Sequence, residues 1–372
     1  MTWLECNKMS LREEFVLLAS KEGCNFSDIC RNFSISRPTG YKWLKRYQNK
    51  GLKNLVDKPR TRKTIKHKTD IDIENLILEL RKKHHAWGAR KLKRRLENLG
   101  HKNIPSHVTV NNILKRNNVI SQEASDKAKS FIRFEHPYPN DLWQMDFKGY
   151  FETDDSRCYP LTVLDDHSRF SIILKACAYE RTQPVKEALT LAFKKYGLPK
   201  RMTMDNGAPW AGFERKQLTK LTAWLLRLGI NVSHSRPYHP QTQGKDERFH
   251  RTLKSELLSV NKFGDLIEVD AAFDIWRDIY NTERPHQALN MDVPIDHYTI
   301  SKRVYPEHLP EIKYSDTDTV RKINAGGKLS INGKIYNISR ALTGQMVALR
   351  KTKEGIDIYY CHKKIKSINV SL

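Results

Sequence analysis

The sequence predicts a multidomain protein with N-terminal all-α units, a central α/β domain built on a mixed five-stranded sheet, and a small C-terminal β domain. Three observations support this order. The first third of the chain has helical periodicity and most of the positive charge, the middle alternates strand and helix patterns, and the last part has short strand patterns separated by turns. A chain of 372 residues exceeds one ordinary core, so roughly two to four domains are expected.

The chain is strongly basic, and the charge is unevenly distributed. It has 66 Lys and Arg against 42 Asp and Glu, a net charge of +24, and 39% hydrophobic residues, which is enough for a buried core. Residues 1–130 contain 29 Lys and Arg and 13 Asp and Glu, and therefore carry 16 of the 24 net positive charges. A basic region of this kind needs a polyanionic partner, so we expect the N-terminal part to bind nucleic acid.

Cysteine usage and hydropathy exclude several classes of protein. The six cysteines form no C-x-x-C pair, and Cys24 and Cys30 have no matching histidine pair nearby, so neither a zinc site nor a disulfide framework is expected. The N-terminal segment lacks an apolar run of signal-peptide length, and no run reaches the roughly 18 apolar residues that a membrane span needs. We expect an intracellular, cytoplasmic protein with no membrane partner and no small-molecule cofactor.

Residues 1–50 predict a helix-turn-helix domain of three short helices. Ser27 is the expected N-cap of the second helix, and Pro38 suits the first turn of the third. The alternative is a small helical domain with a solvated basic face, because this motif also occurs by chance. The third helix leaves four side chains for a DNA groove or phosphates, namely Thr39, Lys42, Lys45 and Arg46.

Residues 51–69 are rich in Lys and Arg and predict a basic linker, which could follow phosphates or serve only for solubility. Residues 70–120 predict a second DNA-binding domain of three helices. Its middle helix carries an apolar stripe of Leu92, Leu96 and Leu99. The basic side chains around that stripe are Arg90, Lys91, Lys93, Arg94 and Arg95, of which Arg90, Lys93 and Arg94 are expected to contact DNA.

After a linker at residues 121–136, residues 137–300 predict the α/β domain. Three consecutive strands lead into a helix, a short strand, a second helix, a further strand, a helix that begins near Gly244 and a last helix. Residues 301–317 are expected to form a linker. Residues 318–372 then predict a small β-barrel-like or sandwich domain, with a hairpin turn at Asn332-Gly333.

Three acidic residues in this middle region form a candidate metal-binding triad. Asp146 lies in the strand pattern WQMDF, Asp205 closes the strand pattern RMTM, and Glu247 lies in the predicted helix. Open α/β sheets bind ligands where strands end. Taken alone, each acid is more easily explained by a surface strand, a turn or a solvated helix.

Helical phase distinguishes Glu247 from its neighbour Asp246. At about 100° per residue, Glu247 lies about 200° from Phe249, which belongs to the buried stripe, whereas Asp246 projects close to that stripe. Glu247 shares its own face with Arg251 and Lys254, at i+4 and i+7. We therefore predict Glu247, and not Asp246, as the third acid.

The segments WQMD, MDNG and RPYHPQTQGKDERFHRTLK together resemble the DDE recombinases, that is, insertion-sequence transposases and retroviral-type integrases with an RNase H-like core. The resemblance is strongest over about residues 137–300, and its most specific part runs from Pro237 to Lys254. The paired N-terminal helical units suit insertion-sequence transposases better than viral integrases, which begin with a His/Cys zinc domain. The 41 residues between Asp205 and Glu247 exceed the common family spacing and leave the subfamily open.

The resemblance implies a DNA transposase that binds terminal inverted repeats and catalyses metal-dependent 3′-end cleavage and strand transfer. Asp146, Asp205 and Glu247 would be catalytic and would hold two Mg²⁺ ions, for which Mn²⁺ is expected to substitute. The partners would be double-stranded DNA of transposon ends and target, bound by a homo-oligomer. The residues nearest the DNA end would be Gln241, Gln243, Lys245, Arg248, Arg251 and Lys254.

Two other functions fit parts of the sequence. A sequence-specific repressor or domesticated DNA-binding factor with an inactive core would need the helix-turn-helix units but not three carboxylates in these contexts. A hydrolytic nuclease acting on RNA–DNA hybrids would need the acids but not a DNA-reading N-terminal part.

Overall fold

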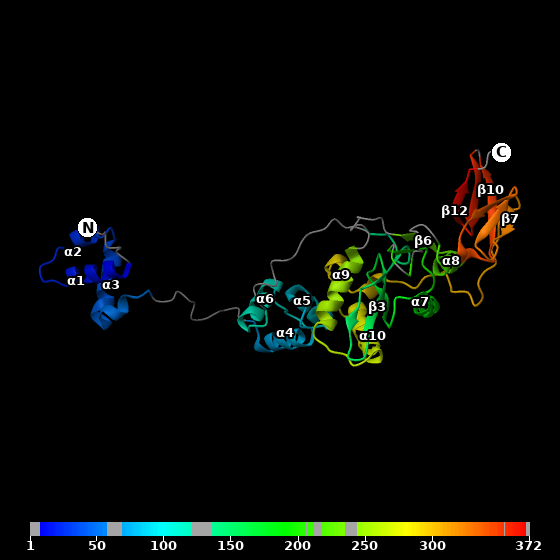
Figure 1. Ribbon diagram of the computed structural model, residues 1–372. Helices are drawn as coiled ribbons and strands as arrows, with labels where there is room; N and C mark the ends of the chain where they lie inside the picture. Colours follow the sequence, from blue (N-terminus) through cyan, green and yellow to red (C-terminus); the bar gives the residue numbers. More distant parts are fainter. Residues whose placement is uncertain are drawn as a thin grey trace. The chain divides into compact units, whose positions relative to one another are not determined.

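The computed structural model describes residues 8–57, 69–120, 135–205, 207, 209–210, 218–234, 244–352 and 354–369. The chain divides into two compact units, residues 1–68 and 69–372. Figure 1 labels their helices and strands. Among the described residues, no helix is both long and apolar enough to cross a membrane.

The first unit contains the predicted helix-turn-helix arrangement. Phe15, Val16 and Trp43 are buried at its centre. Ser36 caps the third helix, because its hydroxyl accepts a hydrogen bond from Thr39 N at 3.4 Å. The helices are α1 Lys8–Ala19, α2 Phe26–Asn32 and α3 Arg37–Lys50.

Two predictions for this unit are corrected. The N-cap of α2 is Asn25, not Ser27, since the Asn25 side chain accepts from Asp28 N at 3.3 Å. The linker does not begin at residue 51, because a short 3₁₀ helix, Leu52–Leu55, packs back onto the unit and buries Leu55 completely. Residues 58–68 lie outside the described part of the chain.

A second group of three helices begins the second unit, as predicted. Its apolar centre includes Ile77, Trp87 and Leu92. The predicted stripe on its middle helix is correct for Leu92 and Leu96 but wrong for Leu99, which is 52% exposed because the helix ends just before it. The helices are α4 Ile71–Lys83, α5 Ala89–Asn98 and α6 His107–Arg116.

The central domain contains a mixed sheet with its main strands in the order β4-β3-β1-β5-β6. The strands β1, β4, β5 and β6 run parallel, while β3 runs antiparallel to its neighbours β1 and β4. This confirms the mixed five-stranded core, to which a two-residue strand, β2, is added at the start of β3. The bounds are β1 Trp143–Phe147, β2 Phe151–Glu152, β3 Arg157–Asp165, β4 Ser171–Cys177, β5 Arg201–Met204 and β6 Asn231–His234.

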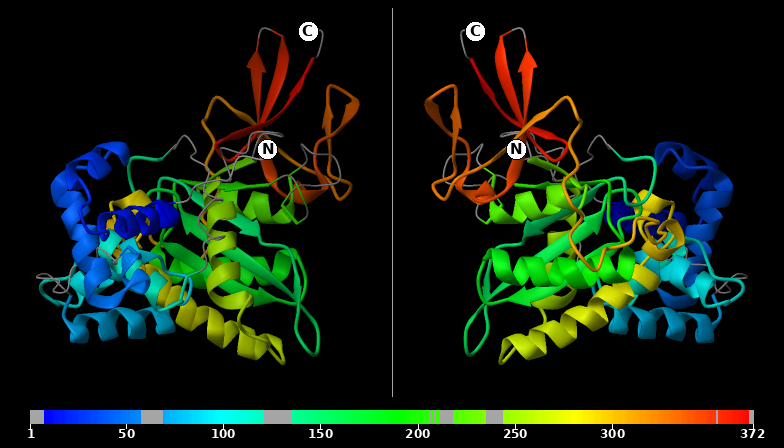
Figure 2. Two further views of the ribbon diagram at one scale, coloured as in Figure 1. Left: turned by 90° about the vertical axis from the view of Figure 1, so that its left-hand side faces the viewer. Right: turned by 90° about the vertical axis from the view of Figure 1, so that its right-hand side faces the viewer.

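Helices cover both faces of this sheet. Trp143 and Met145 of β1 point to the face covered by α7 and α8, whereas Leu164 and Leu174 point to the face covered by α9 and α10. In Figure 2, α9 crosses the sheet in the left view, and α7 and α8 cross it in the right view. The helices are α7 Thr182–Tyr196, α8 Lys220–Arg227, α9 Gly244–Leu253, its π-helical continuation Lys254–Leu258, and α10 Leu266–Thr282.

The C-terminal part is a small β domain, as predicted. The pairings among its described residues form an open antiparallel sheet, β12-β11-β10-β7, and a separate hairpin, β8-β9, so barrel-like closure stays a prediction. Asn332 and Gly333 turn the hairpin with φ of 49° and 75°, which suits a type I′ turn. The strands are β7 Thr319–Lys322, β8 Lys328–Ile331, β9 Lys334–Asn337, β10 Met346–Thr352, β11 Gly355–Tyr360 and β12 Lys363–Ile368.

Candidate active site

Asp146 and Asp205 lie at the same edge of the central sheet. Strands β1 and β5 are parallel neighbours, and Gln144 is paired with Thr203, so each aspartate lies two residues beyond a paired position. The backbone N–H of Gly207 donates to Oδ1 of Asp205 at 2.9 Å and holds that carboxylate in the turn after β5. The local sequences thus bring two acids together because parallel strands end at one edge.

The electrostatic environment of Asp146 is strongly negative. Burial raises the pKa of Asp146 to about 7, and the negative charges of Asp205, Glu180 and Glu247 contribute to this rise. Acidic neighbours that raise the pKa of the buried Asp146 make a negative site that a cation would offset, and carboxylate oxygens are the ligands that Mg²⁺ prefers. The donor set therefore fits a hard divalent cation. Within the described ranges, however, no three His, Cys, Asp or Glu side chains form a finished metal-binding group.

The predicted difference between Glu247 and Asp246 is confirmed as a difference in burial. Glu247 is exposed on α9, whereas Asp246 is 2% exposed. Burial raises the pKa of Asp246 well above its usual range, and the charges of Asp146 and Asp166 add to this. Among the described residues, Oδ1 of Asp246 has no hydrogen-bond partner. Asp246 thus lies behind the site, with its carboxyl group directed into the protein.

A hydrogen-bonded chain joins α9 to the strand that carries Asp146. The Thr162 hydroxyl on β3 donates to the main-chain oxygen of Asp146 at 3.0 Å, and its Oγ1 lies 2.8 Å from Nε2 of His250 on α9. Because the Thr162 proton is used on Asp146, the His250 ring must donate in this contact. Burial lowers the pKa of His250 to about 4, so the ring is neutral at pH 7.

Two charged residues near the site were not among the predicted site residues. Glu180 follows β4, and its charge contributes to the raised pKa of Asp146. Lys148 lies two residues after Asp146, and its pKa is lowered by burial and by the positive charge of Lys254. Continued one residue past the end of β1, the period of two puts Lys148 on the same face as Asp146 and could have identified it, whereas the position of Glu180 depends on the order of the strands.

The predicted DNA-contacting residues of α9 are placed in two different environments. Arg248, Arg251 and Lys254 are exposed. Lys245 instead points inward and forms an ion pair with Asp166. Gln241 and Gln243 lie outside the described residues.

The predicted DNA-contacting residues of α5 are partly engaged within the chain. Arg94 forms an ion pair with Asp292 at 2.9 Å, while Lys93 pairs with Glu97 of its own helix. Arg90 is exposed. The basic face of α5 thus docks in part on the central domain, and Arg90 is the predicted contact that stays most accessible.

Two of the four predicted contacts of the first unit, Lys42 and Arg46, lie over the ring of Trp43 on α3. The guanidinium group of Arg46 lies 4.7 Å from the Trp43 ring centroid, and the ammonium group of Lys42 lies 4.9 Å from it. Lys45 is exposed, and Thr39 Oγ1 lies 2.9 Å from the hydroxyl of Ser36. These cations therefore lie on one helix beside a buried indole, and packing on the indole restricts the aliphatic parts of their side chains.

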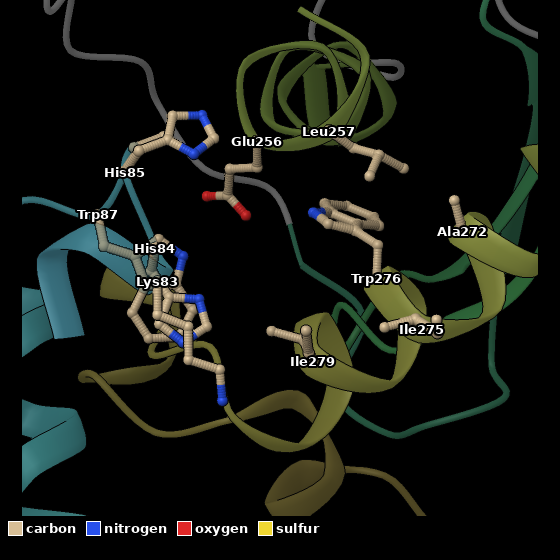
Figure 3. Close-up of a pocket in the computed structure, with 11 residues that line it drawn as sticks. Lys83, His84, His85, Trp87, Glu256, Leu257, Ala272, Ile275, Trp276 and Ile279 are labelled. Carbon is tan, nitrogen blue, oxygen red and sulfur yellow. The ribbon is translucent and has the colours of Figure 1, made fainter. Parts of the chain in front are cut away.

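A cavity of about 280 Å³ lies between the turn after α4 and helix α10. Figure 3 shows His84 and Trp87 on one side, Glu256 and Leu257 of the π-helical segment above, and Trp276 on α10. None of the three candidate acids lines it. This mainly apolar cavity and the acidic edge of the sheet are thus separate features.

Sequence profiles of known families match the chain in two regions. A profile described as an integrase core domain matches residues 136–240, and a second with that description matches residues 228–294. In the N-terminal part, a helix-turn-helix domain profile matches residues 11–63, and a homeodomain-like domain profile matches residues 39–114.

The relatives include proteins of insertion elements. The chain is 27% identical to the insertion element IS407 uncharacterized 31.7 kDa protein of Burkholderia multivorans, over 42% of this chain and 54% of that protein, so the match spans about half of the relative. It is 21% identical to the "Putative transposase for insertion sequence element IS5376" of Geobacillus stearothermophilus, over 97% of this chain and 88% of that protein. 

Among solved structures, the catalytic core domain of HTLV-2 integrase in complex with magnesium is 16% identical and superposes with a TM-score of 0.34, over 44% of this chain and 99% of that chain. The family assignment rests on the sequence matches and on the topology of the sheet. The two integrase core matches, the relative that spans nearly the whole chain, and the strand order β4-β3-β1-β5-β6 agree. Residues 136–294 therefore carry an integrase core domain, and the chain is similar to insertion-sequence transposases and retroviral-type integrases of the DDE, RNase H-like superfamily.

Proposed function

We propose that this protein is a DNA transposase that binds the ends of its own element, cuts their 3′ strands and joins them to target DNA. The observation that carries the proposal is the placement of Asp146 and Asp205, which each lie two residues beyond a paired position of the neighbouring parallel strands β1 and β5. Glu247, an exposed residue of α9, follows Asp205 after 41 intervening residues, and the charges of both acids add to the effect of burial on the pKa of Asp146. A protein that only binds DNA has no need to gather like charges in this way.

The three carboxylates are proposed to hold two divalent cations, Mg²⁺ or Mn²⁺. Bound cations would neutralise the crowded phosphate charge and activate the attacking water or 3′-hydroxyl. Asp146 and Asp205 contribute oxygen ligands from adjacent strands, and Glu247 contributes one from α9. The Gly207 N–H fixes the orientation of Asp205 before substrate arrives, since it already donates to Oδ1.

The exposed cations around the acids are proposed to bind the DNA end. Arg251 and Lys254 share the helical face of Glu247, and the positive charge of Lys254 lowers the pKa of Lys148. Like charges held near one another favour an anionic partner such as phosphate. The helix-turn-helix unit and Arg90 of α5 are proposed to recognise the terminal repeats, and a multimer on DNA would supply the second active site.

The experiment is a strand-transfer assay with purified full-length protein and labelled DNA fragments that carry the two ends flanking the coding region. Wild-type protein should join these ends to a target plasmid in Mg²⁺ or Mn²⁺. The Asp205→Asn variant should lose about 100-fold or more of this activity, because it loses a charged ligand that acts in the transition state.

Asp154→Asn is the matched control, because Asp154 is an exposed aspartate of the same domain in the hairpin between β2 and β3. It should join ends like the wild type. If Asp205→Asn and wild type behave alike, the transposase proposal fails. Binding to the element ends without any joining, in both metals, would favour the DNA-binding repressor instead.

A further inference from the structure

Lys245 lies in the first turn of α9, two residues before Glu247, and its side chain is only 15% exposed. Its Nζ forms an ion pair with the carboxylate of Asp166 and also lies 3.0 Å from the main-chain oxygen of Asp166. Asp166 is itself 1% exposed. The ammonium group is therefore committed to a buried partner and does not face a groove where DNA would bind.

Asp166 is held rigidly by neighbouring residues of the central domain. Gln144 Nε2 donates to its Oδ1 at 2.6 Å, and the backbone N–H of His136 donates to its Oδ2 at 2.8 Å. Its own N–H donates to the main-chain oxygen of Leu142 at 2.9 Å. Gln144 lies on β1, two residues before Asp146 and on the same face. The partner of Lys245 is thus fixed to the strand that carries the first candidate acid.

Glu247 lies between two polar attachments of α9. Lys245 ties the start of the helix to Asp166, and His250 ties its middle to Thr162, whose hydroxyl holds the main-chain oxygen of Asp146. Apolar packing of Phe249 completes the contact. Apolar contacts alone tolerate a small slide or rotation, whereas two directional attachments do not. The phase of the helix, and with it the direction of the Glu247 carboxylate, is set by these attachments.

We propose that Lys245 is a positioning residue, which holds the first turn of α9 against Asp166 and so keeps Glu247 aimed at Asp146, and that it does not contact DNA. This inference rests on the proposed role of the three acids as metal ligands. It replaces the expectation, drawn from the sequence, that Lys245 lies at the DNA end. Removing the ammonium group would leave Asp166 buried without its cation and would loosen the start of the helix.

The test is a titration of the full-length protein with Mn²⁺ alone. Binding is measured by calorimetry and by the electron paramagnetic resonance signal of free Mn²⁺. Glu247→Gln should raise the Kd for Mn²⁺ by about 10-fold, and Lys245→Met should raise it by a similar factor, because residues that orient ligands affect affinity nearly as much as ligands do. The Kd for Mn²⁺ of the double variant should lie within about 2-fold of the higher Kd of the two single variants, since the two changes disrupt the same interaction.

A second readout separates positioning from DNA contact. In metal-free buffer, Lys245→Met should bind a labelled DNA duplex within about 2-fold of wild type, whereas Arg251→Met, which removes an exposed cation from the same helix, should bind it several-fold more weakly at low salt. Lys262→Met removes an exposed lysine outside the site and should change neither Kd. Weaker duplex binding by Lys245→Met with unchanged Mn²⁺ affinity would overturn the proposal, and so would additive effects in the double variant.

If Lys245→Met does not fold, Lys245→Gln, which keeps a hydrogen-bond donor for Asp166, replaces it in the same set of single and double variants. If neither variant folds, the ion pair is required for folding and the positioning role is overturned. Asp146→Asn separates this inference from the proposed function. Unchanged Mn²⁺ affinity in Asp146→Asn would overturn the metal site itself. Weaker Mn²⁺ binding in Asp146→Asn, with no change in Lys245→Met, would overturn only the role of Lys245.

Discussion

The carboxylate of Glu256 lies 2.9 Å from Nε of Arg284, and each of these side chains is 8% exposed. Lys91 of α5 approaches the same carboxylate at 3.8 Å. Glu256 thus joins the second group of helices to the central domain through a buried charge, whereas Arg94 and Asp292 join them through a pair that is 40% and 33% exposed. The two contacts should differ greatly in their effect on stability.

Glu256→Ala should lower the free energy of unfolding of the full-length protein by about 3–5 kcal/mol, because it leaves Arg284 buried without a counter-charge. Arg94→Ala should lower it by less than about 1 kcal/mol, because solvent screens the exposed pair. Urea unfolding followed by tryptophan fluorescence measures both, since Trp87 and Trp276 line the cavity at this contact. Equal losses in the two variants would contradict the prediction.

His84 should make the protein sensitive to mild acid. Its ring is stacked 3.8 Å from that of Trp87, and burial lowers its pKa to about 4. The unfolded state binds a proton at His84 near pH 6.5, and the folded state does not. The free energy of unfolding is therefore unaffected by His84 above pH 6.5, and it falls by about 3 kcal/mol in all as the pH falls toward 4. His84→Phe keeps the stack and should make this part of the pH profile of the unfolding midpoint shallower, although His250, whose pKa is also lowered to about 4, keeps part of the slope. An unchanged slope would contradict the assignment.

Asp146→Asn should stabilise the protein when metal is absent. The pKa of Asp146 is raised to about 7, so its ionisation costs stability as the pH rises from about 4 to 7, and the neutral amide avoids that cost at pH 8. The unfolding temperature in a buffer with a chelator should therefore be higher for the variant than for wild type. Addition of Mn²⁺ should raise the midpoint of wild type but not of the variant. A variant less stable than wild type under chelation would contradict this account.

Gly40→Ala should disrupt the first unit. A Cβ at this position of α3 would lie 2.7 Å from Sγ of Cys30 and 2.9 Å from the Phe15 ring, so the core would have to shift at a cost of about 1–3 kcal/mol. Gly88→Ala is the control, because nothing lies within 4 Å of its added Cβ. The helical circular dichroism signal of the full-length protein and its affinity for the element ends should both decrease in Gly40→Ala. Both should stay at the wild-type level in Gly88→Ala.

Several features follow from short stretches of sequence, because their physical cause is local. The 100° step of the α-helix separates Glu247 from Phe249, and the exposed and buried positions of α9 agree with that phase. Asn332-Gly333 requires positive φ at two successive residues, and the hairpin forms there. Strand and helix alternation likewise predicted the mixed sheet between residues 137 and 300.

Other features depend on residues that are far apart in the chain. The long side chain of Lys245 could reach solvent, DNA or protein, and only the register of β1 against β3 puts Asp166 beneath it. The role of Arg94 changes for the same reason, since Asp292 becomes its neighbour only after α5 docks on the central domain. Within a helix, the sequence by itself determined which face a residue occupies, as it did for Glu247 and Asp246, through the geometry of one turn. Tertiary structure alone decided what each face meets, because ion pairs form between whichever charges the packing of distant elements brings together.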